Sequence, residues 1–188
     1  MLKIIVTEKA FEDKDIGYDS QYDLYCEIEV DEGATYEEAM YAWFKALKVA
    51  GYENIEAADA DSVAFVFMGH GTSHNAKVSY SQMQAQMKEL GYSNVFIGTV
   101  EGEPEETACE EVIKAVSEAG YKKVVLRPLM VVAGDHANND MAGEEEDSWL
   151  SMFKAAGKFD SVDTQISGLG RIDAVKNLYV EHTKAVIE

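Results

Sequence analysis

Three side chains that could bind a metal ion each follow a predicted β-strand. His70 follows the run VAFVFMG, Glu101 follows VFIGTV, and His136 follows VVLRPLMVVAGD. Because the carboxyl ends of parallel strands meet at one edge of a sheet, we expect these side chains to lie close together. Two imidazoles and a carboxylate suit borderline divalent ions such as cobalt, nickel, iron or zinc. Three protein ligands also leave coordination positions open, as a catalytic or metal-transfer site requires.

The same histidines and the residues around them could instead have purely structural roles. A lone loop histidine is more often structural or exposed than a ligand, but two of the four histidines of this chain follow matched strands. Gly69 and Gly71 let the backbone come close to a flat ligand, or they only make a tight turn. Met68, Leu129 and Met130 could form an apolar wall for that ligand, or they could belong to the core.

Further polar residues near these strands have two interpretations each. His74 either faces the site or caps the helix that follows it. The acidic run EEED at 144–147 is favourable in the first turn of a helix, and it could also attract cations toward His136. Arg127 precedes a proline inside a strand, where it could bind a carboxylate ligand or form a structural ion pair.

The elements that position these residues alternate regularly after residue 61. Strands are predicted at 62–68, 94–100, 123–132 and 162–168, and helices at 74–90, 104–119, 140–155 and 172–187. The strand cores VAFVF, VFIG and VVL are continuous apolar runs, which is typical of strands buried on both faces of a parallel sheet. The alternation predicts an α/β fold, a three-layer sandwich around a four-stranded parallel sheet with right-handed crossovers.

The first 60 residues have a different pattern. Strands are predicted at 2–6 and 22–30, followed by a helix at 36–49 that ends at Gly51. This small ββα unit has no assigned role. We therefore predict two domains, residues 1–60 and 61–188, with a boundary set only by the change of pattern.

The composition disfavours several classes of function. Acidic residues outnumber basic ones 35 to 16, and the net charge of −19 repels nucleic acid and anionic membranes. The sequence has neither an apolar segment long enough to span a bilayer nor a signal-peptide pattern. Cys26 and Cys109 fit two free thiols in a reducing compartment better than a disulfide. We expect a cytoplasmic protein that binds neither nucleic acid nor membrane.

Longer motifs around the three candidate ligands carry a specific resemblance. They are VFMGHGTSHNA, VEGEPE and LMVVAGDHANNDMAGEEEDSW, with FKAAG, SGLG and the last helix further along. Together they resemble the class II tetrapyrrole chelatases, and within them the anaerobic sirohydrochlorin cobaltochelatases of cobalamin biosynthesis. The resemblance covers about residues 61–188, which correspond to the C-terminal half of the family.

The resemblance implies a chelatase-like fold and a lyase that inserts Co²⁺ into a tetrapyrrole, with Fe²⁺ or Ni²⁺ as alternatives. It also implies that His70, Glu101 and His136 bind the metal, and that a histidine, His70 or His136, takes protons from the pyrrole nitrogens. Gly69, Gly71 and Met130 would lie against the tetrapyrrole. This chemistry agrees with the residues, because a neutral imidazole near pH 7 can be both a base and a metal ligand.

The N-terminal half of the family has no counterpart in this sequence. In the family that half forms a second lobe and the other wall of the cleft, and IIVTEKA does not match the opening SFGTS pattern of the family. A homodimeric cobaltochelatase, in which each chain supplies a lobe, is the favoured interpretation. A non-catalytic metal or tetrapyrrole carrier, or a subunit that needs a different partner chain, remain as alternatives. Sirohydrochlorin carries many carboxylates, so a chain this acidic needs local cationic donors to bind it.

Overall fold

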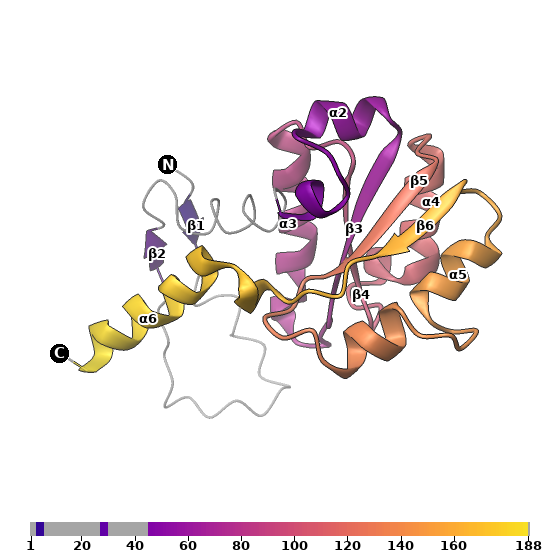
Figure 1. Ribbon diagram of the computed structural model, residues 1–188. Helices are drawn as coiled ribbons and strands as arrows, with labels where there is room; N and C mark the ends of the chain where they lie inside the picture. Colours follow the sequence, from indigo (N-terminus) through magenta and orange to yellow (C-terminus); the bar gives the residue numbers. More distant parts are fainter. Residues whose placement is uncertain (1–2, 6–26, 30–44, 188) are drawn as a thin grey trace.

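The computed structural model describes residues 3–5, 27–29 and 45–187 (Figure 1). In the N-terminal part, β1 (Lys3–Ile5) pairs antiparallel with β2 (Glu27–Glu29), inside the two strands predicted there. Of the helix predicted at 36–49, only residues 45–49 are described, and they are helical. The rest of that helix and Cys26 lie outside the described residues.

A four-stranded parallel sheet forms the centre of the fold and confirms the predicted α/β class. Its strands are β3 (Val63–Gly69), β4 (Val95–Thr99), β5 (Lys123–Pro128) and β6 (Ser161–Thr164), in the order β4-β3-β5-β6. Every residue of β3 and β4 is buried, as their continuous apolar runs predict. The strand order matters for the site, because the strands that lead to Glu101, His70 and His136 are three direct neighbours.

Helices cover both faces of this sheet and give the three predicted layers. On one face α2 (Ile55–Ala60), α3 (Val78–Glu89), the start of α6 (Asp173–Ile187) and residues 45–49 surround a core that includes Phe65, Phe67 and Val125. On the other face α4 (Cys109–Glu118) and α5 (Trp149–Ala155) cover Val66, Met68 and Leu126. The later part of α6 extends away from the sheet (Figure 1). Nothing in the described part of the chain is a helix long and apolar enough to cross a membrane.

Two strands are shorter than predicted. β5 ends at Pro128 rather than at 132, because a proline has no N–H to continue the ladder. β6 ends at Thr164 rather than at 168. Beyond it the chain turns and pairs irregularly with the segment after β5, where Leu169 N–H donates to the Met130 carbonyl and Gly170 N–H donates to the Val131 carbonyl.

The prediction of a single helix at 140–155 was wrong. The chain instead forms a five-residue π-helix, η5 (Ala137–Met141), and then the separate helix α5. Residues 144–147 lie in the loop between them, and Ser148 caps α5 by accepting a hydrogen bond from the Ser151 N–H at 3.2 Å. The acidic run therefore precedes a helix rather than forming its first turn.

Helix starts differ from prediction in two other places. A 3₁₀ turn, η3 (Asn75–Lys77), precedes α3, and another, η4 (Glu105–Thr107), precedes α4. Pro104 lies just before η4 in an extended conformation, not at a first helical position. Helix α2 was not predicted. The helix end predicted at Gly51 is confirmed, since Gly51 has φ of 85°.

Candidate functional site

His70, Glu101 and His136 lie together at the carboxyl edge of the sheet, His70 and Glu101 just beyond β3 and β4, and His136 eight residues beyond β5 at the start of η5. The imidazole rings of His70 and His136 meet edge to face, with their centroids 4.7 Å apart. The Nε2 atom of His70 lies 3.9 Å from a carboxylate oxygen of Glu101. About half of the His70 and Glu101 side-chain surfaces (53% and 52%) is exposed, so an ion or a larger ligand can reach them.

Local contacts fix the proton of the His70 ring. Its Nδ1 lies 3.0 Å from the Gly71 carbonyl oxygen, which can only accept a hydrogen bond. In the neutral ring the proton is therefore on Nδ1, and the lone pair of Nε2 faces Glu101. The backbone nearby is equally constrained, because the Glu101 N–H donates to the His70 carbonyl at 2.9 Å.

The glycines on either side of His70 are explained by packing within the protein. A Cβ added at Gly69 would lie 2.5 Å from a ring carbon of Tyr80. Gly71 has φ of 92°, and a Cβ there would lie 2.9 Å from the Cβ of Glu101. Packing against Tyr80 thus requires Gly69, and the turn that brings His70 and Glu101 together requires Gly71.

The ring of His136 is held by a residue that the sequence analysis missed. Its Nδ1 lies 2.6 Å from Oδ2 of Asp140, four residues further on in the π-helix η5. The Asp140 carboxylate accepts a hydrogen bond from Nδ1–H, which leaves the Nε2 lone pair of His136 free, as in many metal-binding histidines. The signal in the sequence is the pattern HANND, in which a histidine and an aspartate are four residues apart.

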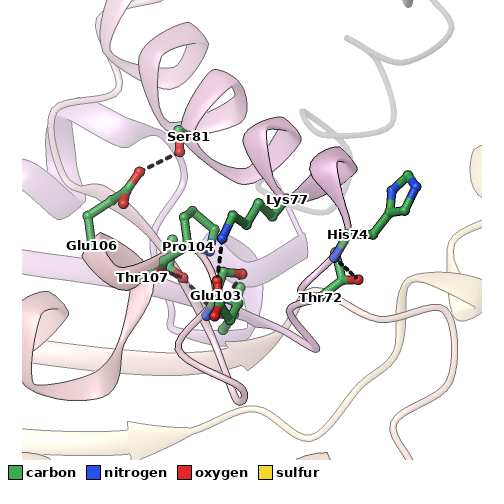
Figure 2. A network of polar contacts seen from close by, with 9 residues as sticks. Thr72, His74, Lys77, Ser81, Glu103, Pro104, Glu106 and Thr107 are labelled. Atoms are coloured by element: carbon green, nitrogen blue, oxygen red, sulfur yellow. Dashed lines mark hydrogen bonds and ion pairs between the residues drawn. The ribbon is translucent and has the colours of Figure 1, made fainter. Parts of the chain in front are cut away.

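The loop that carries Glu101 is anchored to neighbouring elements by polar contacts (Figure 2). The ammonium group of Lys77 lies 2.6 Å from the carboxylate of Glu103. The Glu103 N–H donates to the hydroxyl of Thr99 at 3.1 Å, and this hydroxyl lies 2.6 Å from that of Thr107. Thr107 in turn donates to the Pro104 carbonyl at 2.6 Å. These contacts fix the backbone on both sides of Glu101.

The other candidates lie elsewhere or have structural roles. His74 caps η3, since its Nδ1 accepts a hydrogen bond from the Ala76 N–H at 3.1 Å. Met68 is fully buried and belongs to the core. Leu129 and Met130 are partly buried and pack against opposite faces of the sheet.

Arg127 is fully buried in the described structure. Its three guanidinium nitrogens make no hydrogen bond there, so the ion pair considered from the sequence is not found among the described residues. Burial lowers the pKa of the guanidinium.

As the side chains stand, no trio of histidine, cysteine or carboxylate residues in the described part of the chain is close enough to hold a metal ion. An ion bonded to two ligands at about 2.1 Å brings their donor atoms about 3.0 to 3.5 Å apart. The 3.9 Å separation between His70 and Glu101 is about half an ångström longer than that. Rotation of these exposed side chains, without backbone movement, is enough to close such a gap.

Comparisons with known proteins agree with the resemblance seen in the motifs. A family model described as cobalt chelatase (CbiK) matches residues 31–188, starting upstream of the predicted domain boundary. The sirohydrochlorin cobaltochelatase of Salmonella typhimurium is 40% identical over 117 residues, which cover 62% of this chain and 42% of that protein. The sirohydrochlorin cobaltochelatase CbiKC of Nitratidesulfovibrio vulgaris is 32% identical over 124 residues, 66% of this chain and 42% of that protein.

The aligned part of the chain thus spans less than half the length of either relative. The family match nevertheless covers most of the chain, including all three strand ends that carry His70, Glu101 and His136. This chain belongs to the cobalt chelatase family.

Proposed function

We propose that the protein inserts Co²⁺ into sirohydrochlorin, as a chelatase (lyase) of cobalamin biosynthesis. The observation that carries the proposal is the grouping of His70, Glu101 and His136 at the open edge of the sheet, in a chain of the cobalt chelatase family. In this reaction the metal ion is a substrate. We propose Co²⁺ because the relatives are named for it, with Fe²⁺ and Ni²⁺ as alternatives.

In the first step the three side chains capture the ion. Both imidazoles offer an Nε2 lone pair, since each Nδ1 faces an oxygen acceptor, the Gly71 carbonyl or the Asp140 carboxylate. Glu101 supplies a negative charge that offsets part of the charge of the cation. Three ligands leave the side of the ion that faces solvent open to the nitrogens of the tetrapyrrole.

In the second step the ion moves to the macrocycle and two pyrrole N–H protons leave it. Each bond that the ion gives up at His70 or His136 frees a lone pair that can accept one of these protons, so protons and bases balance. Imidazole is suited to both roles near neutral pH. Asp140, 2.6 Å from Nδ1 of His136, stabilises the imidazolium that forms there.

We further propose that the working form is a cytoplasmic homodimer in which a second chain completes the cleft. The support is the extent of the match, because the aligned part of the chain corresponds to only 42% of either relative. The same observation favours a second candidate function. A chain with one wall of the cleft could bind the metal or the tetrapyrrole as a carrier without completing insertion.

An anaerobic insertion assay with purified protein, Co²⁺ and sirohydrochlorin tests the proposal, alongside the mass of the protein in solution. We expect insertion above the uncatalysed rate, its loss in His136→Ala, and wild-type rates in the control His182→Ala, which changes an exposed histidine of α6. Cobalt binding should be lost in His136→Ala as well. Tetrapyrrole binding without turnover of Co²⁺, Fe²⁺ or Ni²⁺ would refute the enzyme and favour the carrier.

A further inference from the structure

A surface cavity of about 850 Å³ adjoins the loop that carries His136. Among its lining residues are residues 131–133 and Asn138, which lie on either side of His136 in the sequence. Ordinary ligand pockets range from about 300 to 1,000 Å³, so this one has room for a large ligand. A ligand in the cavity lies against the segment that presents His136.

The segment that contains Gly168 and Gly170 also lines the cavity and lies against the loop that carries His136. Gly168 and Gly170 belong to the lining, and a Cβ at either position would meet the Val131 carbonyl oxygen at 2.5 or 2.8 Å. The Gly170 N–H also donates to that carbonyl at 2.9 Å. The backbone around Gly168 and Gly170 is therefore in direct contact with the backbone at Val131, and neither glycine has room for a side chain.

Most of the apolar side chains in the lining are exposed. Val132 is 73% exposed, Ile166 46% and Val180 48%. Tyr179, which precedes Val180 in α6, is 57% exposed. Contiguous apolar side chains left in water mark a surface that binds an apolar partner or ligand.

The charged groups of the cavity have the sign opposite to that of the whole chain. Its lining contains Arg171 and Lys176 and no acidic residue of the described part of the chain, although acidic residues outnumber basic ones 35 to 16 in the sequence. Asp173 pairs with Lys176 at 2.5 Å but does not belong to the lining. An exposed guanidinium at Arg171 is well suited to bind a carboxylate through two hydrogen bonds.

Two further cationic side chains, Lys45 and Arg127, lie near Arg171. Burial lowers the pKa of Lys45, and the charges of Arg127 and Arg171 lower it further. Arg127 is completely buried and makes no hydrogen bond to the described residues, so no described carboxylate cancels its charge. The result is a local positive field within an acidic protein, which attracts anionic ligands to this edge.

A ligand that fits these observations has a wide apolar face and several carboxylates on its rim. We propose that the cavity binds one face of a polycarboxylated tetrapyrrole, and that Arg171 and Lys176 bind its peripheral carboxylates. The inference rests on the proposed function and deepens it, because it names the groups that recognise the substrate. It also explains how a chain of net charge −19 can accept a polyanion.

The test is the binding of metal-free sirohydrochlorin, followed by fluorescence at several salt concentrations without metal. We expect Arg171→Gln to raise the Kd about ten-fold, the loss expected for a hydrogen-bonded charge. Arg171→Lys should recover part of the affinity, Lys176→Gln should weaken binding less, and the salt dependence should fall in both glutamine variants. The matched control is Lys184→Gln on the same helix, where Lys184 pairs with Glu181 and does not line the cavity. It should bind as the wild type does.

Wild-type affinity in both Arg171→Gln and Lys176→Gln would overturn the inference, and so would a change in solution mass without any change in affinity. The result also separates this inference from the proposed function. Binding that depends on Arg171, in a protein that inserts no metal, keeps the inference and refutes the enzyme. Cobalt insertion with affinity unchanged in both variants keeps the enzyme and refutes the inference.

Discussion

The hydrogen bond between His136 and Asp140 gives the sharpest prediction about the site. Replacing Asp140 with asparagine removes the charge from a 2.6 Å hydrogen bond to Nδ1. The asparagine amide can also donate to Nδ1, which would move the ring proton to Nε2 and block the atom proposed to bind cobalt. Loss of such a supporting group typically costs about 10- to 100-fold in metal affinity or activity. Because the two side chains are 38% and 43% exposed, we expect about the lower limit, a ten-fold loss or about 1.4 kcal/mol.

The assay is a calorimetric titration with Co²⁺, together with ¹⁵N NMR of the His136 ring to follow its tautomer. The matched control is Asp135→Asn, which removes a carboxylate of the same segment that bonds to Asn139 rather than to His136. We expect the control to keep wild-type affinity and tautomer. An Asp140→Asn variant with unchanged cobalt affinity and unchanged Nδ1 protonation would show that Asp140 does not position the ring.

Three further predictions concern the loop near Glu101, the buried thiol and the acid stability of the fold. Thr107→Val should lower the free energy of unfolding in urea by about 1 to 3 kcal/mol, because it removes both hydrogen bonds of a buried hydroxyl, those to Thr99 and Pro104. The control Ser81→Ala removes only an exposed hydrogen bond to Glu106 and should cost less than about 0.5 kcal/mol, and equal effects of the two variants would contradict the proposed anchoring. Burial, with a smaller effect of Glu110, raises the pKa of the Cys109 thiol, so in a Cys26→Ser background native protein at pH 8 should resist a thiol reagent until it is unfolded. Hydrogen bonds from Lys123 and then Tyr52 lower the pKa of Asp61 below its ordinary 3.8. The stability this adds is present above pH 3.8 and lost as the pH falls through the lowered pKa, so acid titration of Asp61→Asn should show a weaker pH dependence below about pH 4.

The sheet and the grouping of the candidate ligands could be predicted from the sequence, for a physical reason. Continuous apolar runs such as VAFVF are stable only when both faces are covered, and this fixes a parallel sheet with its strand ends at one edge. The placement of His70 and Glu101 follows from that, whereas His136 lies eight residues beyond the end of β5. Their role in binding cobalt stays a prediction.

Other features depend on contacts that no local pattern specifies. Residues 140–155 were predicted as one helix, but the π-helix η5 places Asp140 against His136 and Ser148 caps a new helix. The burial of Arg127 is equally unpredictable from sequence, because a cation in a strand is normally expected to have a partner. The polar contacts around Thr107 join residues from different elements, and these become neighbours only in the folded chain.

The order β4-β3-β5 has a consequence for metal selectivity. His70 and Glu101 directly follow the paired strands β3 and β4, and the Glu101 N–H donates to the His70 carbonyl, so the sheet fixes the backbone positions of both residues. His136 lies eight residues beyond the end of β5, at the start of η5, so the sheet does not fix its backbone in the same way. If the three side chains bind cobalt as proposed, adjustment to an ion of different radius falls mainly to the segment between β5 and η5. Selectivity among first-row ions then depends on how freely that segment moves, because the ligand types themselves discriminate weakly.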